Sequence, residues 1–188
     1  MGLFITHPEV VVDPATPVTC WSLSEQGQAR MRTFAAASVV DSVTAIWSSA
    51  ERKAKEAAEL LGGRLALPIQ VLESLGENDR SATGFLPPEE FETVADAFFE
   101  SPAKSVRGWE TAAAAQLRIR GAVAGIAAGH VEGDLAILSH GAVGALLLCS
   151  CLGAPISRAH DQPSQGHFFS FDPQSFEVLH LWRPLEAA

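Results

Sequence analysis

The amino-acid sequence predicts an α/β fold, a three-layer α/β/α sandwich built around a mostly parallel central sheet. Short apolar runs alternate along the chain with longer segments whose apolar residues recur every three or four positions, which is the pattern of strands followed by amphipathic helices. The run at 134–139 is almost continuously apolar, as expected for a strand that is covered on both faces. With 188 residues, 47% of them hydrophobic, the chain can bury a sizeable core, so we expect one domain over residues 1–188.

The first half of the chain alternates strands with helices. Strands are expected at 2–6, 43–47 and 68–72. Ser24 takes the N-cap position of a helix that runs to residue 37, because a serine hydroxyl can accept from the free N–H groups of a first turn. A second helix, at 50–61, is expected to end at the glycine pair that follows it.

The second half opens with a polar stretch, 78–88, whose glycine and prolines indicate a long excursion between two elements. Two helices, a central strand, a further helix and a closing strand pair are then expected, at 87–99, 109–128, 134–139, 141–152, and 167–171 with 178–182.

Charge and cysteine content narrow the function classes. The formal net charge of −9, from 13 Lys and Arg against 22 Asp and Glu, opposes a nucleic-acid partner. Three cysteines match neither a disulfide framework nor the spacing of a zinc site, which favours a reducing, cytoplasmic setting. The longest apolar stretch, 142–152, is too short to cross a bilayer, so no membrane anchor is expected. A small anionic substrate would need a local positive pocket.

Two histidines stand at the exits of apolar runs far apart in the chain. His7 follows the strand at 2–6 and His140 follows the strand at 134–139. Because ligands of open α/β sheets bind at the carboxyl ends of the strands, the two imidazoles could meet over one substrate. His140 also precedes Gly141 at a helix start, where N–H groups and the helix dipole favour an anion. One strand-end histidine is more often structural, but two on one sheet suit phosphoryl transfer.

Four segments resemble, in order and spacing, the motifs of the histidine phosphatase superfamily, the phosphoglycerate mutase-like proteins. They are Ile5-Thr6-His7-Pro8-Glu9, the run from Leu23 to Arg30, the run from Ser48 to Ala58, and Leu138-Ser139-His140-Gly141. The resemblance covers almost the whole chain. It implies that His7 takes the phosphoryl group as a phosphohistidine and that His140 and Gly141 help to hold the transferring oxygens.

The chain departs from the family pattern at three positions of the expected phosphate site. Thr6 stands where the family has an arginine, and a hydroxyl can donate only one hydrogen bond. Pro8 replaces a glycine and removes a backbone donor. Lys53 replaces the second arginine and offers a point charge in place of a planar fork. We therefore expect weaker phosphate contacts, with Thr6 and Lys53 still contributing.

The stretch after the third strand is expected to supply the remaining groups. The resemblance places Glu77 as the general acid that protonates the leaving oxygen, with Glu73 as the alternative. We hypothesise that Arg80 replaces the lost guanidinium and that Ser81, with Thr83, adds lesser donors. The competing interpretation is a solvated polar loop.

Three residues elsewhere receive plainer expectations. Arg118 and Arg120 lie two apart on one helix and so point to different faces, and surface exposure is expected for them. Gln162 belongs to a Gly/Pro/Ser-rich segment that could rim the pocket.

The leading function is thus a phosphomonoester hydrolase acting through a phosphohistidine on a small phosphorylated substrate, with a mutase less favoured. The alternative is a binding or regulatory module that keeps the fold and a phosphate ligand but has weakened or lost turnover. A metal-dependent hydrolase ranks third, because no two histidines have a ligand spacing such as His-x-x-x-His. No metal or organic cofactor is implied, and a homodimer through apolar helix faces stays open.

Overall fold

The computed structural model describes residues 1–188 and contains one six-stranded sheet with the strand order β3-β2-β4-β1-β5-β6. The strands are β1 (Gly2–Thr6), β2 (Val43–Ser48), β3 (Ile69–Val71), β4 (Asp134–Ser139), β5 (His167–Phe171) and β6 (Val178–Pro184). The first four are mutually parallel, whereas β5 runs antiparallel to β1 and β6 antiparallel to β5. The mostly parallel sheet predicted from sequence is confirmed.

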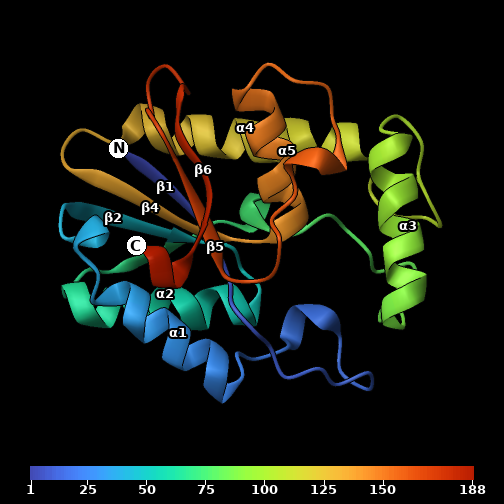
Figure 1. The fold of residues 1–188 in the computed structure, drawn as a ribbon, viewed down its shortest axis with the longest axis horizontal. Helices are drawn as coiled ribbons and strands as arrows, with labels where there is room; N and C mark the ends of the chain where they lie inside the picture. The colour runs from blue at the N-terminus through green and yellow to red at the C-terminus, as the bar shows by residue number, and fades with distance from the viewer.

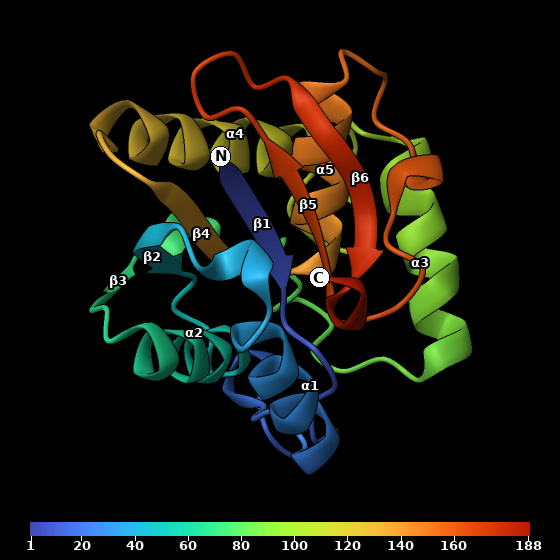
Figure 2. The same cartoon turned by 60° about the vertical axis from the view of Figure 1, so that its left-hand side comes forward.

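Helices cover both faces of this sheet (Figure 1). Helices α1 (Glu25–Ala35) and α2 (Arg52–Leu65) pack on one face, and α4 (Ala112–Gly129) and α5 (Gly141–Cys151) pack on the other. Helix α3 (Pro88–Glu100) stands to one side of these layers, as the turned view in Figure 2 also shows. The three-layer architecture is therefore as expected.

Two apolar cores follow from the alternation of side chains along the strands. On β1, Leu3 and Ile5 pack with Phe34 of α1 and Leu61 of α2, while Phe4 turns to the opposite core. All of these side chains are fully buried. No helix in the structure combines the length and the apolar character that a bilayer crossing requires.

Most predicted elements are confirmed, but the end of α2 is not where the glycine pair predicts it. Ser24 does cap α1, its hydroxyl accepting from the Gly27 N–H at 3.0 Å. Helix α2, in contrast, continues through Gly62 and ends at Leu65, followed by the C-cap residue Ala66, which has a left-handed backbone with φ of 55°. A Cβ at Gly62 would lie 2.9 Å from the Leu67 carbonyl oxygen. That glycine permits a close approach of the returning chain and does not stop the helix.

The strand register brings the ends of three parallel strands to one edge of the sheet. Thr6 of β1 pairs with Ser139 of β4, and Ser48 of β2 pairs with Leu138. The residues that follow these strand ends therefore leave the sheet side by side. This edge is where open α/β folds bind ligands.

Candidate phosphoryl-transfer site

His7 and His140 meet at this edge of the sheet, as the sequence predicts. Their ring centroids lie 5.3 Å apart with the planes inclined by 66°. The two residues are separated by most of the chain, and the parallel pairing of β1 with β4 is what brings them together.

The His7 ring is held as the neutral tautomer that a nucleophile needs. Its Nδ1 lies 2.9 Å from the Pro8 carbonyl oxygen, which can only accept, so Nδ1 carries the proton and Nε2 keeps its lone pair. Burial lowers the pKa of His7 well below its usual value, and the neighbouring His140 and Lys53 lower it further. His7 lines the main cavity of the molecule. A neutral imidazole with a free nitrogen thus faces that cavity.

His140 lies behind His7 and is fully enclosed. Its Nε2 is 2.7 Å from the Ser49 hydroxyl and 3.4 Å from Glu51 Oε1. Burial lowers its pKa well below the usual value, and the positive charge of Lys53 adds to this. Unlike His7, His140 is not part of the cavity wall. The Nε2 atom of His140 is therefore surrounded by the Ser49 hydroxyl and the Glu51 carboxylate.

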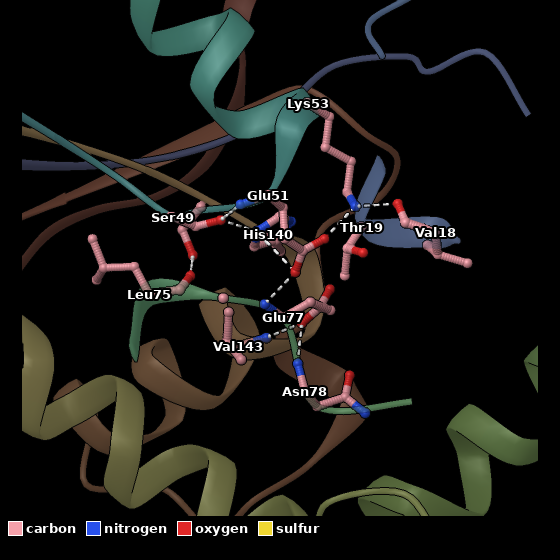
Figure 3. Close-up of polar contacts among 12 residues, drawn as sticks. Val18, Thr19, Ser49, Glu51, Lys53, Leu75, Glu77, Asn78, His140 and Val143 are labelled. Carbon is pink, nitrogen blue, oxygen red and sulfur yellow. Dashed lines mark hydrogen bonds and ion pairs between the residues drawn. The ribbon is translucent and has the colours of Figure 1, made fainter. Parts of the chain in front are cut away.

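Glu51 contacts two basic residues of the site, Lys53 and His140, as Figure 3 shows. The sequence analysis did not identify this residue. One of its oxygens forms an ion pair with Lys53, whose side chain is only 3% exposed and also donates to the Val18 carbonyl at 2.9 Å. The other oxygen accepts from the Glu77 N–H at 2.9 Å. In the sequence, Glu51 stands next to Arg52 at a helix start and is typical of a surface charge. The cation assigned to phosphate is therefore neutralised by an internal carboxylate.

Glu77 lies in the cavity wall at the N-terminus of α5. Its carboxylate accepts from the N–H groups of Ala142 at 3.2 Å and Val143 at 3.1 Å, and also from its neighbour Asn78 at 3.1 Å. A carboxylate at a helix start is stabilised by the unpaired N–H groups and the dipole. Glu73, the alternative acid, is exposed and is not part of the cavity wall.

Arg118 donates hydrogen bonds to the segment that carries Glu77 and is partly buried. The prediction that it is exposed at the surface is wrong. The guanidinium donates to the carbonyls of Ser74 and Gly76, both at 2.9 Å, and pairs with Glu110 at 2.7 Å. A third carbonyl, that of Glu77 itself, accepts at 3.1 Å. These turn carbonyls have no strand partner, and an arginine fork supplies the donors they need. Arg120 is not exposed either, because its guanidinium packs 3.5 Å above the centre of the Phe176 ring.

Two residues assigned to phosphate binding have other roles, and those assignments are corrected. The buried Thr6 hydroxyl donates to Gln162 Oε1 at 2.6 Å and accepts from the His167 N–H at 3.0 Å, so its one proton is already engaged. Ser81 is exposed and lies outside the cavity wall, and its N–H donates to Asp79. Thr83 lies outside this wall as well and accepts from the Trp109 indole at 2.8 Å.

Arg80, Gly141 and Gln162 do line the cavity. The Arg80 guanidinium lies 5.1 Å from the centre of the Phe91 ring and forms no ion pair with a carboxylate of the protein. A Cβ at Gly141 would lie 2.5 Å from Gln162 Nε2, so the glycine leaves room for that amide. The cavity wall therefore has one cation without a carboxylate partner, and its neutral amides include Gln162, which is bonded to Thr6 next to His7.

No three His, Cys, Asp or Glu side chains lie close enough together to hold a metal ion. The cavity itself measures about 580 Å³, and its polar end is formed by His7, Lys53, Glu77 and Gln162. Such a volume is typical of small-molecule sites.

Comparison with known proteins identifies the family. A family model described as the histidine phosphatase superfamily (branch 1) matches residues 19–179. The chain belongs to the histidine phosphatase superfamily. The match starts after the segment that carries His7, so the assignment of His7 to the first family motif rests on its position at the end of β1.

Solved structures share the fold of this histidine phosphatase at low sequence identity. A mycobacterial glucosyl-3-phosphoglycerate phosphatase in complex with inorganic phosphate has 20% identity and a TM-score of 0.76, with 99% of this chain and 98% of that chain covered. A phosphoserine phosphatase mutant from Entamoeba histolytica, in complex with phosphoserine, has 15% identity and a TM-score of 0.77, with 96% and 95% covered. A putative alpha-ribazole-5'-P phosphatase from Escherichia coli has 16% identity and a TM-score of 0.75, with 100% and 98% covered. No curated protein sequence matches the chain significantly.

Proposed function

We propose that the protein is a phosphomonoester hydrolase that passes the phosphoryl group through His7. The observation that carries the proposal is the His7 ring, whose Nδ1 proton is fixed on the Pro8 carbonyl while Nε2 is free beside the cavity. Its lowered pKa keeps this nitrogen unprotonated at neutral pH. Membership of the family and the phosphatase neighbours support the same activity.

In the first step, His7 Nε2 attacks phosphorus, a P–N bond forms and the P–O bond to the leaving alcohol breaks. The leaving oxygen needs a proton, and Glu77 in the cavity wall is the group proposed to deliver it. Glu77 accepts three backbone N–H groups as a carboxylate, so it must first take up a proton, for example from the monoanion of the substrate. In the second step water attacks phosphorus, Glu77 takes the proton that the water loses, the P–N bond to His7 Nε2 breaks, and inorganic phosphate leaves.

The charge that develops on the transferring oxygens needs donors. Arg80 is the cation without a carboxylate partner in the cavity wall, and Gly141 lies at the first turn of α5, whose N–H groups favour an anion. Lys53 and His140 can contribute once the Glu51 carboxylate gives way. Inorganic phosphate is expected to bind the same groups as the product.

Two observations favour the second candidate, a phosphate-binding module with little or no turnover. Glu51 neutralises Lys53, and Thr6 supplies no positive charge beside His7. These two features weaken the stabilisation of a phosphoryl transition state without removing the pocket.

An aryl phosphate assay separates the two candidates. Wild-type protein should release phosphate, and His7→Ala should lower the rate by about a thousandfold or more, because the covalent step is lost. His130→Ala is the matched control, because His130 lies at the edge of the sheet opposite the site. It follows α4 and contacts the carbonyl of Gly133 just before β4. Acid-labile phosphate trapped on the wild type but not on His7→Ala would identify the intermediate. Turnover that survives the His7 change contradicts the proposed route, and wild type that binds phosphate without turnover supports the module.

A further inference from the structure

The cavity extends from His7 well beyond the volume that a phosphoryl group needs. Much of its lining is apolar and comes from two segments that lie far apart in the sequence. The residues are Val10, Val12, Val18 and Trp21 from the first segment, and Phe85, Leu86, Phe91, Phe98, Phe99 and Trp109 from the second. We call this apolar part of the cavity the aromatic chamber. Most of its second wall belongs to α3 and its flanks, the helix that stands to one side in Figures 1 and 2.

The rings of the chamber contact one another, and hydrogen bonds to the surrounding protein fix its two tryptophan side chains. Trp21 and Phe85 face each other across the two segments with centroids 5.9 Å apart, and Trp109 lies 6.0 Å from Phe91 and 6.1 Å from Phe98. The Trp109 indole N–H donates to Thr83, and the Trp21 indole N–H donates to two carbonyls of its own loop, those of Asp13 and Thr16. The indole N–H groups are therefore both satisfied by the protein. Trp109 is almost fully buried, whereas Trp21 and Phe85 are half-buried and keep part of their ring surface accessible.

Two arginines of the cavity wall, Arg80 and Arg158, lie beside the chamber. Arg80 lies against Phe91 and Trp109, at 5.1 and 5.7 Å from their centroids, and has no carboxylate partner. Arg158 also lines the cavity, but Glu92 and Asp96 neutralise it on its exposed side. A ligand that spans the cavity thus meets one cation without a carboxylate partner, Arg80, and otherwise mainly apolar side chains in the chamber. A sugar hydroxyl among the rings away from Arg80 would lose its water without gaining a partner.

We propose that the aromatic chamber binds the alcohol part of the substrate, and that the substrate is a phosphomonoester of a large apolar or aromatic alcohol. The inference rests on the proposed function for the position of the phosphoryl group. It adds the class of leaving group. Trp21 and Phe85, both only half-buried, are the specificity-determining residues, because their contacting rings join the two segments and form an accessible apolar part of the chamber.

Binding of non-hydrolysable phosphonates tests the chamber without requiring turnover. Methyl-, phenyl- and 2-naphthylphosphonate share the anionic head and differ in apolar area, and calorimetry on the full chain gives their dissociation constants. We expect affinity to rise at least about tenfold from the methyl to the naphthyl compound, since burial of apolar surface is favourable. Phe85→Ala should remove about tenfold of the naphthyl affinity and leave methylphosphonate unchanged.

The matched control is Leu117→Ala, which removes an apolar side chain that is 76% exposed on α4 and outside the cavity. Trp21→Leu probes the opposite wall and replaces Phe85→Ala if the latter does not fold, as judged by thermal unfolding. Equal affinity for the three phosphonates overturns the inference, as does a loss that is the same for all three in both wall variants. Graded affinity that the wall variants reduce supports it.

Hydrolysis measured in parallel keeps the two proposals apart. 2-Naphthyl phosphate and phenyl phosphate are assayed with wild type and with His7→Ala. Graded phosphonate binding without any turnover that depends on His7 supports the chamber and contradicts the hydrolase. Turnover that depends on His7 together with flat phosphonate binding supports the hydrolase and contradicts the chamber.

Discussion

Replacing Glu51 with glutamine should tighten phosphate binding, which is the opposite of what loss of a catalytic acid would do. The carboxylate pairs with Lys53, stands 3.4 Å from His140 Nε2 and accepts the Glu77 N–H. Glutamine has nearly the same shape and keeps one oxygen as an acceptor, but it removes the negative charge. The change therefore separates the electrostatic role of Glu51 from its role in packing.

The size of the effect follows from Coulomb's law. At an effective dielectric constant of about 20, two unit charges about 5 Å apart repel each other by about 3 kcal/mol. A phosphate ion beside Lys53 is repelled by Glu51, and Glu51 also weakens its attraction to the lysine. Removing the carboxylate charge therefore favours phosphate binding in both ways. With about 1.4 kcal/mol for each factor of ten, we expect the dissociation constant for inorganic phosphate to fall by about 10- to 100-fold.

The same substitution has a cost in stability. Without its counter-charge, the buried Lys53 ammonium keeps only neutral acceptors, and breaking a buried ion pair costs about 3 kcal/mol in the free energy of unfolding. Phosphate should restore part of this loss, because a ligand stabilises the state to which it binds.

Calorimetry with inorganic phosphate and vanadate near pH 7 measures the affinity, and urea unfolding measures the stability. Glu59→Gln, an exposed residue on the same helix, controls for the change in net charge. Weaker phosphate binding in Glu51→Gln than in Glu59→Gln would refute the reasoning, because Glu51 would then assist the anion.

Three further outcomes are expected. Burial lowers the pKa of His7 and His140, so below pH 6.5 the unfolded chain binds more protons than the folded protein. The free energy of unfolding, measured by urea unfolding, should therefore fall as the pH is lowered below 6.5, by about 1.4 kcal/mol per pH unit per histidine. For the same reason, the acid limb of kcat/KM should lie below pH 6.5, and a limb above it would contradict a neutral His7. Arg118→Ala should cost about 3 kcal/mol of stability in urea and also lower kcat, whereas Arg52→Ala, which breaks an exposed pair, should cost less than about 0.5 kcal/mol.

The sequence predicts the fold well because the fold depends on patterns that lie within single segments. Apolar alternation fixes β1 and β4, and their parallel pairing follows from the helices between strands. The meeting of His7 and His140 then needs only that each follows a strand of one sheet. The predicted end of α2 was wrong because Gly62 allows the close approach of the Leu67 carbonyl, and this tertiary contact cannot be inferred from the local sequence.

The polar contacts of the site could not be predicted in the same way, because they join residues that no local pattern relates. Glu51 and Arg118 each resemble an ordinary surface charge in sequence, yet one contacts Lys53 inside the site and the other holds the loop before Glu77. Nothing in the spacing of Thr6 and Gln162 indicates their hydrogen bond across 156 positions. Such pairs depend on which loop carbonyls and carboxylates become buried together, and this is decided by the packed structure.

These polar contacts change what the site can select. Where the family resemblance implies an arginine beside His7, the chain has the Thr6 hydroxyl, which orients the Gln162 amide so that its nitrogen lies against Gly141. Residue 6 is thus bonded to a neutral amide and brings no cation to the site, and Glu51 cancels the charge of Lys53. With Arg80 left as the cation without a carboxylate partner, the phosphoryl group alone can supply less of the binding free energy than in a site with two arginines. The remainder has to come from the alcohol part, and the aromatic chamber next to Arg80 is the surface that can provide it.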